Sequence, residues 1–141
     1  GVEVNIYLQA DAGLVLNPYQ LDAYAKLLDK LPELDKNCRA ALCEYLQNNH
    51  DYIDTHRWYI NNNIFPEWQW MIPILDNIPA FVSAMTLENI EFNASGIYAV
   101  EKPLKLEYRI DPKHEKFCHI LAVNCDTKGN ILDIQEAEYC D

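Results

Sequence analysis

Apolar and polar residues alternate most regularly in the last third of the chain, from Leu104 to Glu138. In Leu104–Ile110 every second residue is apolar, and strand side chains repeat every two residues, so one face would be apolar and the other charged. The almost wholly apolar run Cys118–Cys125 is typical of a central strand covered on both faces. Asp126–Gly129, with sequence DTKG, suits a type I turn closed by a left-handed glycine. Asn130–Glu136 would then return as a third antiparallel strand.

The middle of the chain carries apolar residues at helical spacing. A first helix is expected from Pro18 to Leu31, because Asn17 is a favourable N-cap and proline suits the first helical position. Gln20, three residues after the cap, could complete a capping box. The spacing predicts a second helix over residues 32–48 and a third around residues 53–60.

Shorter elements complete the pattern. Val2–Leu8 alternates and predicts a half-buried opening strand, residues 87–92 predict another strand, and Ile97–Val100 an edge-like one. Ile64–Ile78 is irregular, and a short helix is expected over residues 79–85. The prediction is one α+β domain, residues 1–141, with a mainly antiparallel sheet of about five strands. This sheet combines the N-terminal strand with a C-terminal meander and is covered by three or four helices.

Net charge adds a constraint on partners. The chain has 22 acidic and 11 basic residues, a formal net charge of −11. This sign disfavours nucleic acids and anionic membranes as partners, because their phosphates would be repelled. Between Ala40 and Val100 seven acidic residues stand against Arg57 alone, and after Cys125 five stand against Lys128. Such an excess serves either as a solvated surface or as a binding surface for a basic partner.

The cysteines indicate a compartment. They are odd in number, with no Cys-x-x-Cys pair: Cys38, Cys43, Cys118, Cys125 and Cys140. A disulfide framework favours an even count and a zinc site favours tighter spacing. Buried reduced thiols are therefore expected, which indicates a cytoplasmic protein.

The histidines are the first place to look for catalysis or metal binding. His50, Asp54 and His56 have suitable side chains, yet one carboxylate and two histidines do not complete a three-ligand zinc site. Cys118 and His119 are adjacent on a predicted strand, so their side chains point to opposite faces and cannot form a nucleophile pair. No catalytic residue, metal site or cofactor is predicted, and we do not expect an enzyme.

Aromatic residues gather inside the acidic stretch. Six lie within residues 52–70: Tyr52, Trp58, Tyr59, Phe65, Trp68 and Trp70. Aromatic side chains supply much of the binding energy at protein interfaces, and acidic neighbours would steer a basic partner toward them. The alternative is that these rings fill the core between helices and sheet. An irregular, proline-broken segment is also compatible with an exposed surface.

The order of elements resembles a known group of proteins. The Glu3–Leu8 strand, the Leu21–Tyr45 helices, the Leu87–Phe92 strand and the Leu121–Glu136 hairpin resemble a family of small bacterial cytosolic proteins of unknown function. That family includes immunity proteins of polymorphic toxin systems, among them contact-dependent growth inhibition. The resemblance implies a cytosolic α+β protein with a possible immunity role, and it carries no site motif from which residue roles could be assigned.

Two hypotheses follow. In the first, the chain is an immunity protein, a monomer or weak dimer, that neutralises a basic toxin domain such as a nuclease by covering its positive surface. Its expected binding residues are Glu44, Asp51, Asp54, Trp58, Glu67, Trp68, Trp70, Asp126, Asp133, Glu136 and Glu138. In the second, it is a small ligand- or metal-binding domain or enzyme with a cleft near His50, Asp54 and His56.

Overall fold

A single five-stranded sheet organises the chain. The computed structural model describes residues 4–11, 16–95, 97–114 and 116–138. The strands follow their sequence order across the sheet, with β1 parallel to β2 and every other neighbouring pair antiparallel. They are β1 (Asn5–Gln9), β2 (Thr86–Asn93), β3 (Leu104–Arg109), β4 (His119–Cys125) and β5 (Ile131–Glu138).

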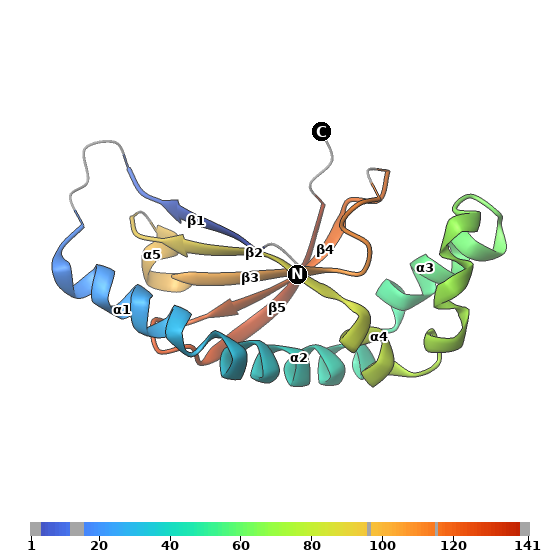
Figure 1. Cartoon of the computed structure of the whole chain (residues 1–141), viewed down its shortest axis with the longest axis horizontal. Coiled ribbons are helices and arrows are strands. Elements are labelled where there is room, and N and C mark those ends of the chain that lie inside the picture. The colour runs from blue at the N-terminus through green and yellow to red at the C-terminus, as the bar shows by residue number, and fades with distance from the viewer. Residues whose placement is uncertain (1–3, 12–15, 96, 115, 139–141) are drawn as a thin grey trace.

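The helices lie between β1 and β2, apart from one short helix before β3. They are α1 (Pro18–Asp29), α2 (Leu31–Asn48), α3 (Asp51–Asn61), the 3-10 helix η1 (Pro66–Ile74), α4 (Ile78–Ala84) and α5 (Ile97–Glu101). Figure 1 shows α1 and α2 along one face of the sheet, α4 beside the C-terminal half of α2, and α3 and η1 beyond its C-terminal end. The α+β prediction is confirmed.

Asparagine side chains cap the N-termini of two helices. The Asn17 side chain accepts from the Gln20 backbone amide at 2.9 Å, and the Gln20 side chain accepts from the Asn17 amide at 3.1 Å. This capping box satisfies two amides that have no partner inside α1. At α4, the Asn77 side chain accepts from the Ala80 amide at 3.1 Å.

The core lies between α2 and the sheet. Every fourth residue of α2 is buried, in the order Leu34, Cys38, Leu42 and Leu46. Residues at this spacing share one helix face, so the stripe packs as a continuous ridge. On the sheet, the core includes Leu106, Tyr108, Leu121 and Val123. The thiols of Cys38 and Cys125 share a hydrogen bond between helix and sheet.

The β4–β5 hairpin has the expected turn. Gly129 has φ +86° and donates to the Asp126 carbonyl at 3.1 Å. The Asp126 carboxylate accepts from the backbone amides of Lys128 and Asn130 at 2.8 and 2.9 Å. A left-handed glycine after a type I turn is what this connection requires.

The sheet face away from α2 is polar, yet β4 is buried on this side as well. Asn124 is 1% exposed and pairs in register with Lys105 on β3 and Asp133 on β5. Long polar side chains from the two neighbouring strands therefore cover the short residues of β4. The expectation of a central strand covered on both faces is confirmed.

Three features differ from the sequence prediction. Residues Ile97–Glu101 form α5 rather than an edge strand, because the chain must turn back between antiparallel neighbours β2 and β3. The opening strand pairs parallel to β2. It is also exposed rather than half-buried over Asn5–Gln9, since the helices do not reach this edge; Val2 lies outside the described residues.

Two findings bear on the environment of the chain. Among the described helices, none combines the length and apolar character needed to cross a membrane. Cys38, Cys43 and Cys125 are free thiols, whereas Cys118 is disulfide-bonded. The expectation of reduced cysteines is therefore wrong for Cys118, and the cytoplasmic location stays a prediction.

Candidate functional site

Helix α3 displays part of the predicted acidic surface. Its inward face buries Tyr52, Ile53, His56 and Ile60. Asp51, Asp54 and Trp58 follow one another at spacings of three and four, which places them together on the outward face. Both carboxylates lie in the first turn, where the helix dipole favours negative charge.

These residues border a shallow open depression. It has a volume of about 340 Å³ and is lined by Asp51, Asp54, Thr55, Trp58 and Tyr59. The Trp58 side chain is 54% exposed. The Trp58 ring meets the Tyr59 ring edge-on at 5.2 Å between centroids. The Phe65 ring in turn stacks on the Tyr59 ring at 4.6 Å. Trp58 is thus an exposed ring held by a packed aromatic base.

Strand β5 brings a further carboxylate to this end of the molecule. Burial raises the pKa of the Tyr45 hydroxyl, and the negative charges of Glu136 and Asp51 raise it further. Both carboxylates therefore lie close enough to Tyr45 to act on it through space. We define the acidic face as Asp51, Asp54 and Glu136 with Trp58.

The charge of the acidic face is not compensated locally. Asp51, Asp54 and Glu136 make no ion pair with any described lysine or arginine. Arg57, the one basic residue between Ala40 and Val100, instead pairs with Asp76 at 2.7 Å. The acidic face therefore keeps its negative field for an external cation.

Other predicted binding residues lie elsewhere. Trp68 is fully buried and donates from Nε1 to Asp111 at 3.0 Å. The prediction that it anchors a partner is therefore wrong, because its indole packs in the core against the rings of His56 and Phe117. Trp70 is 51% exposed on η1. Glu67, also on η1, is exposed and bonded to His114 Nε2 at 2.6 Å.

The remaining acidic residues are divided among several places. Asp126 uses its carboxylate within the hairpin turn. Asp133 lies on the polar sheet face, where it accepts from Asn124 at 2.7 Å. Glu138 pairs with His119 at 2.9 Å, and Glu44 is exposed on α2. The structure thus brings together only part of the predicted set.

The side chains of His50, Asp54 and His56 do not converge on a common cleft as the second hypothesis expects. His56 is fully buried and donates from Nδ1 to the Tyr52 carbonyl at 2.7 Å, whereas His50 and Asp54 are exposed. The His56 ring stacks on Trp68 at 5.2 Å between centroids. It is a core residue, since α3 turns position 56 inward. No group of three or more potential metal ligands occurs among the described residues.

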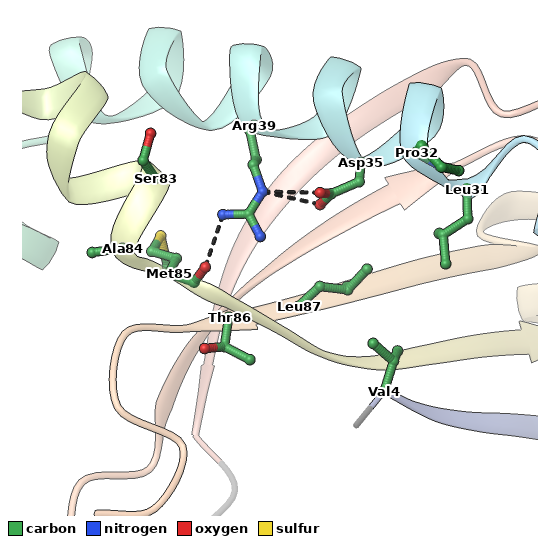
Figure 2. A pocket seen from close by; sticks show the side chains of 10 residues that line it. All are labelled: Val4, Leu31, Pro32, Asp35, Arg39, Ser83, Ala84, Met85, Thr86 and Leu87. Carbon is green, nitrogen blue, oxygen red and sulfur yellow. Dashed lines mark hydrogen bonds and ion pairs between the residues drawn. The ribbon is translucent and has the colours of Figure 1, made fainter. Parts of the chain in front are cut away.

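A second candidate site was not predicted. A hollow of about 560 Å³ lies between α2, α4 and the start of β2 (Figure 2). Most of its lining is apolar: Val4, Leu31, Pro32, Ala84, Met85 and Leu87. Asp35, Arg39, Ser83 and Thr86 supply the polar groups. We call this cavity the Arg39 hollow.

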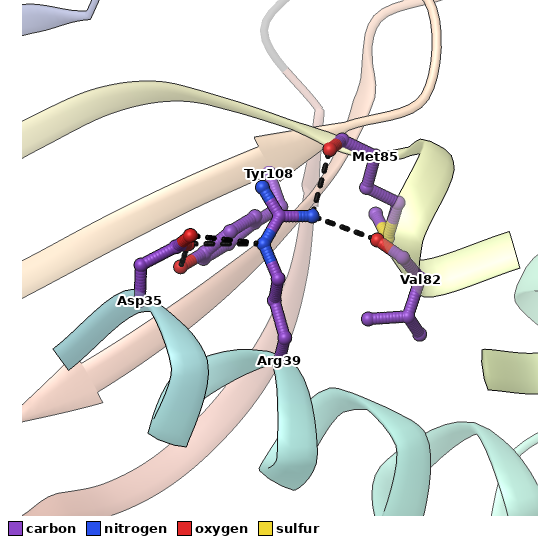
Figure 3. A network of polar contacts seen from close by, with 5 residues as sticks. All are labelled: Asp35, Arg39, Val82, Met85 and Tyr108. Atoms are coloured by element: carbon purple, nitrogen blue, oxygen red, sulfur yellow. Dashed lines mark hydrogen bonds and ion pairs between the residues drawn. The ribbon is translucent and has the colours of Figure 1, made fainter. Parts of the chain in front are cut away.

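Arg39 is held firmly at the wall of this hollow (Figure 3). Its Nε donates to both Asp35 oxygens at 3.1 Å, and Nη1 donates to the carbonyls of Val82 and Met85 at 2.8 Å each. Tyr108 donates its hydroxyl to Asp35 at 2.6 Å, and burial raises the pKa of this phenol. The other terminal nitrogen, Nη2, has no hydrogen-bond partner among the described residues and is directed into the hollow (Figure 2).

One sequence signal could have indicated this network. Asp35 and Arg39 stand four apart, and each flanks the buried stripe of α2. A charged pair beside an apolar stripe indicates partial burial. Its partners, Val82, Met85 and Tyr108, are distant in sequence and carry no comparable signal.

Comparisons of the chain with protein-family models, curated proteins and solved structures find no match.

Burial of His56 generates a pH prediction. Burial lowers the pKa of its imidazole to about 4, from an ordinary value of 6.5. Between these values the unfolded chain binds the proton and the folded chain does not, so stability is present above about pH 6.5 and lost as the pH falls toward 4. Through His56, the wild-type chain should lose about 3 kcal/mol of its free energy of unfolding over this range. We expect His56→Phe to abolish this loss.

The measurement is urea unfolding of both proteins across this pH range. Carboxylates titrate in the same window, so the informative quantity is the difference between the two curves. Parallel curves would show that His56 does not carry this pH dependence.

Proposed function

We propose that this chain is a binding protein that neutralises a basic protein toxin domain, such as a nuclease, through its acidic face. The observation that carries the proposal is the uncompensated pair Asp51 and Asp54 beside the half-exposed Trp58, with the charge of Glu136 acting on Tyr45 together with that of Asp51. The resemblance to immunity proteins supplies the class of partner.

Charge and ring have separate roles in this proposal. The carboxylates occupy positions that nucleic-acid phosphates would take on a nuclease, so they accelerate encounter with its basic surface. Trp58 is large, amphipathic and already supported by Tyr59, so little further ordering is needed when it docks. Carboxylates therefore govern association, and the ring governs residence time.

The first experiment separates these two roles. Affinity capture with the wild-type chain is expected to recover one basic protein, and association with that protein is expected to slow as salt rises. Asp51→Lys with Asp54→Lys should slow association on the order of tenfold or more. Trp58→Ala should speed dissociation by roughly 30-fold while changing association little.

The matched control is Asp29→Lys with Glu101→Lys. This variant changes net charge equally at exposed residues on α1 and α5. It should retain nearly the wild-type association rate, because α2 separates α1 from the acidic face. Equal slowing by both double variants would indicate a net-charge effect and contradict the acidic face as the binding site.

The Arg39 hollow supports a second candidate function, binding of a small apolar ligand. Arg39 Nη2 is a preorganised donor in an apolar cavity of about 560 Å³, a usual arrangement for ligand sites. Asp35 already balances the guanidinium charge. A neutral carbonyl on an apolar body therefore fits better than a carboxylate, which would face Asp35.

Thermal unfolding with three matched probes tests this second function. Hexanamide should raise the melting temperature more than hexanoate or hexylamine, since only the amide is a neutral acceptor. Ser83 is exposed and lines the hollow, so Ser83→Phe should block the effect and Ser83→Ala should preserve it. Equal shifts for all three probes, or shifts unaffected by Ser83→Phe, would contradict ligand binding in this hollow.

A further inference from the structure

The two edges of the sheet differ in their protection against pairing. An edge strand presents unpaired backbone N–H and C=O groups, and proteins usually protect it with charge, proline or a bulge. Edge strand β5 carries Asp133, Glu136 and Glu138, and a register shift leaves Leu132 as an extra residue. Edge strand β1, Asn5–Gln9, has no charged residue, no proline and no register shift against β2.

The side chains of β1 are exposed on both faces. Ile6 and Leu8 pair in register with Ile90 and Phe92, which belong to the buried core, yet they are themselves 53% and 48% exposed. Tyr7 projects from the other face and is 47% exposed. Apolar surface beside an unprotected backbone edge is a surface that favours a further strand.

The sequence of β1 is symmetric in character about Tyr7. It reads amide, aliphatic, aromatic, aliphatic, amide: Asn5, Ile6, Tyr7, Leu8 and Gln9. In an antiparallel pair centred on Tyr7, a second copy would place Leu8 opposite Ile6, Gln9 opposite Asn5 and Tyr7 opposite itself. Each of these pairs is chemically matched, and cross-strand matching stabilises a sheet.

We propose that two copies of this chain pair antiparallel through β1, about a two-fold axis at Tyr7. The two sheets then become one continuous ten-stranded sheet, and the Ile6 and Leu8 side chains of both copies cover one another. A two-fold interface uses the same surface on both copies, which is what the symmetry of β1 provides.

Charge favours a second copy over a basic partner at this edge. With a formal net charge of −11, two copies repel each other except where they present uncharged residues, and β1 is such a place. A basic protein gains no ion pair from Asn5–Gln9. The five-residue edge is short, so the dimer is weak.

Cysteine cross-linking tests the register. Facing residues of antiparallel strands have Cα atoms about 4.5–5.5 Å apart, within disulfide reach, so Tyr7→Cys should form a covalent dimer on mild oxidation. Asn5 lies about 13 Å along the strand from Asn5 of a second copy, because its facing residue is Gln9. Asn5→Cys alone and Gln9→Cys alone should therefore link at least tenfold more slowly, and a mixture of the two should link readily.

The wild-type chain sets the background from its own free thiols. Cross-linking of Tyr7→Cys no faster than this background, or no faster than Asn5→Cys alone, would overturn the proposal. Efficient linking by Asn5→Cys alone would indicate another register, which also overturns it. A chain that stays monomeric while β1 captures an extended segment of another protein is a further contrary outcome.

Light scattering across protein and salt concentration gives a second test. The dimer fraction should rise with salt, because screening reduces repulsion between the copies, whereas binding of the proposed basic partner should weaken. The two proposals can therefore fail separately. Tyr7→Lys should abolish the dimer without unfolding the chain, as checked by circular dichroism, since residue 7 is half exposed. A folded Tyr7→Lys variant that still dimerises would contradict pairing through β1.

Discussion

The position of α2 on the sheet depends on one partly buried polar network. An apolar stripe holds a helix against a sheet, but it resists sliding along the helix axis only weakly. Asp35 and Arg39 add direction, because Asp35 accepts from Tyr108 of β3 while Arg39 donates to the carbonyls of Val82 and Met85. These carbonyls lie at the C-terminal end of α4, where the Val82 carbonyl also accepts from the Met85 amide at 3.1 Å. The network therefore joins α2, the sheet and the entry to β2.

This anchoring also sets where the acidic face lies. Helix α3 begins at Asp51, soon after α2 ends at Asn48, so the direction of α2 determines the position of the first turn of α3. Within α3, His56 faces the aromatic core while Asp54 and Trp58 face outward. Because helix side chains repeat every 3.6 residues, α3 places its packing residues on one side and its carboxylates on the other. Glu136 reaches the same end of the molecule from β5, because the hairpin runs the length of the sheet.

The sequence predicts features that local chemistry decides. Asn17 begins α1 and Gly129 closes the hairpin because a cap and a left-handed turn depend on a few neighbouring residues. It does not predict features that distant packing decides. The segment from Ile97 has strand-forming residues but becomes helical between antiparallel neighbours. Trp68 and Trp58 belong to one aromatic-rich stretch, yet only the fold shows that the first is core and the second is exposed. For the same reason only part of the predicted acidic set forms one surface.

The distribution of ion pairs explains why the two proposed surfaces do not compete. On the polar sheet face, Lys105 and Arg109 of β3 pair with Glu91 and Glu88 of β2, and Lys102, just before β3, pairs with Asp133 of β5. These basic residues are therefore already paired within the sheet, and the acidic face on α3 and β5 is left without a basic partner among the described lysines and arginines. Edge strand β1 has neither sign of charge. In the two proposals, the acidic excess attracts a cationic partner at one end of the molecule, and self-association uses the uncharged strand β1, whose facing residues are apolar or carry amides.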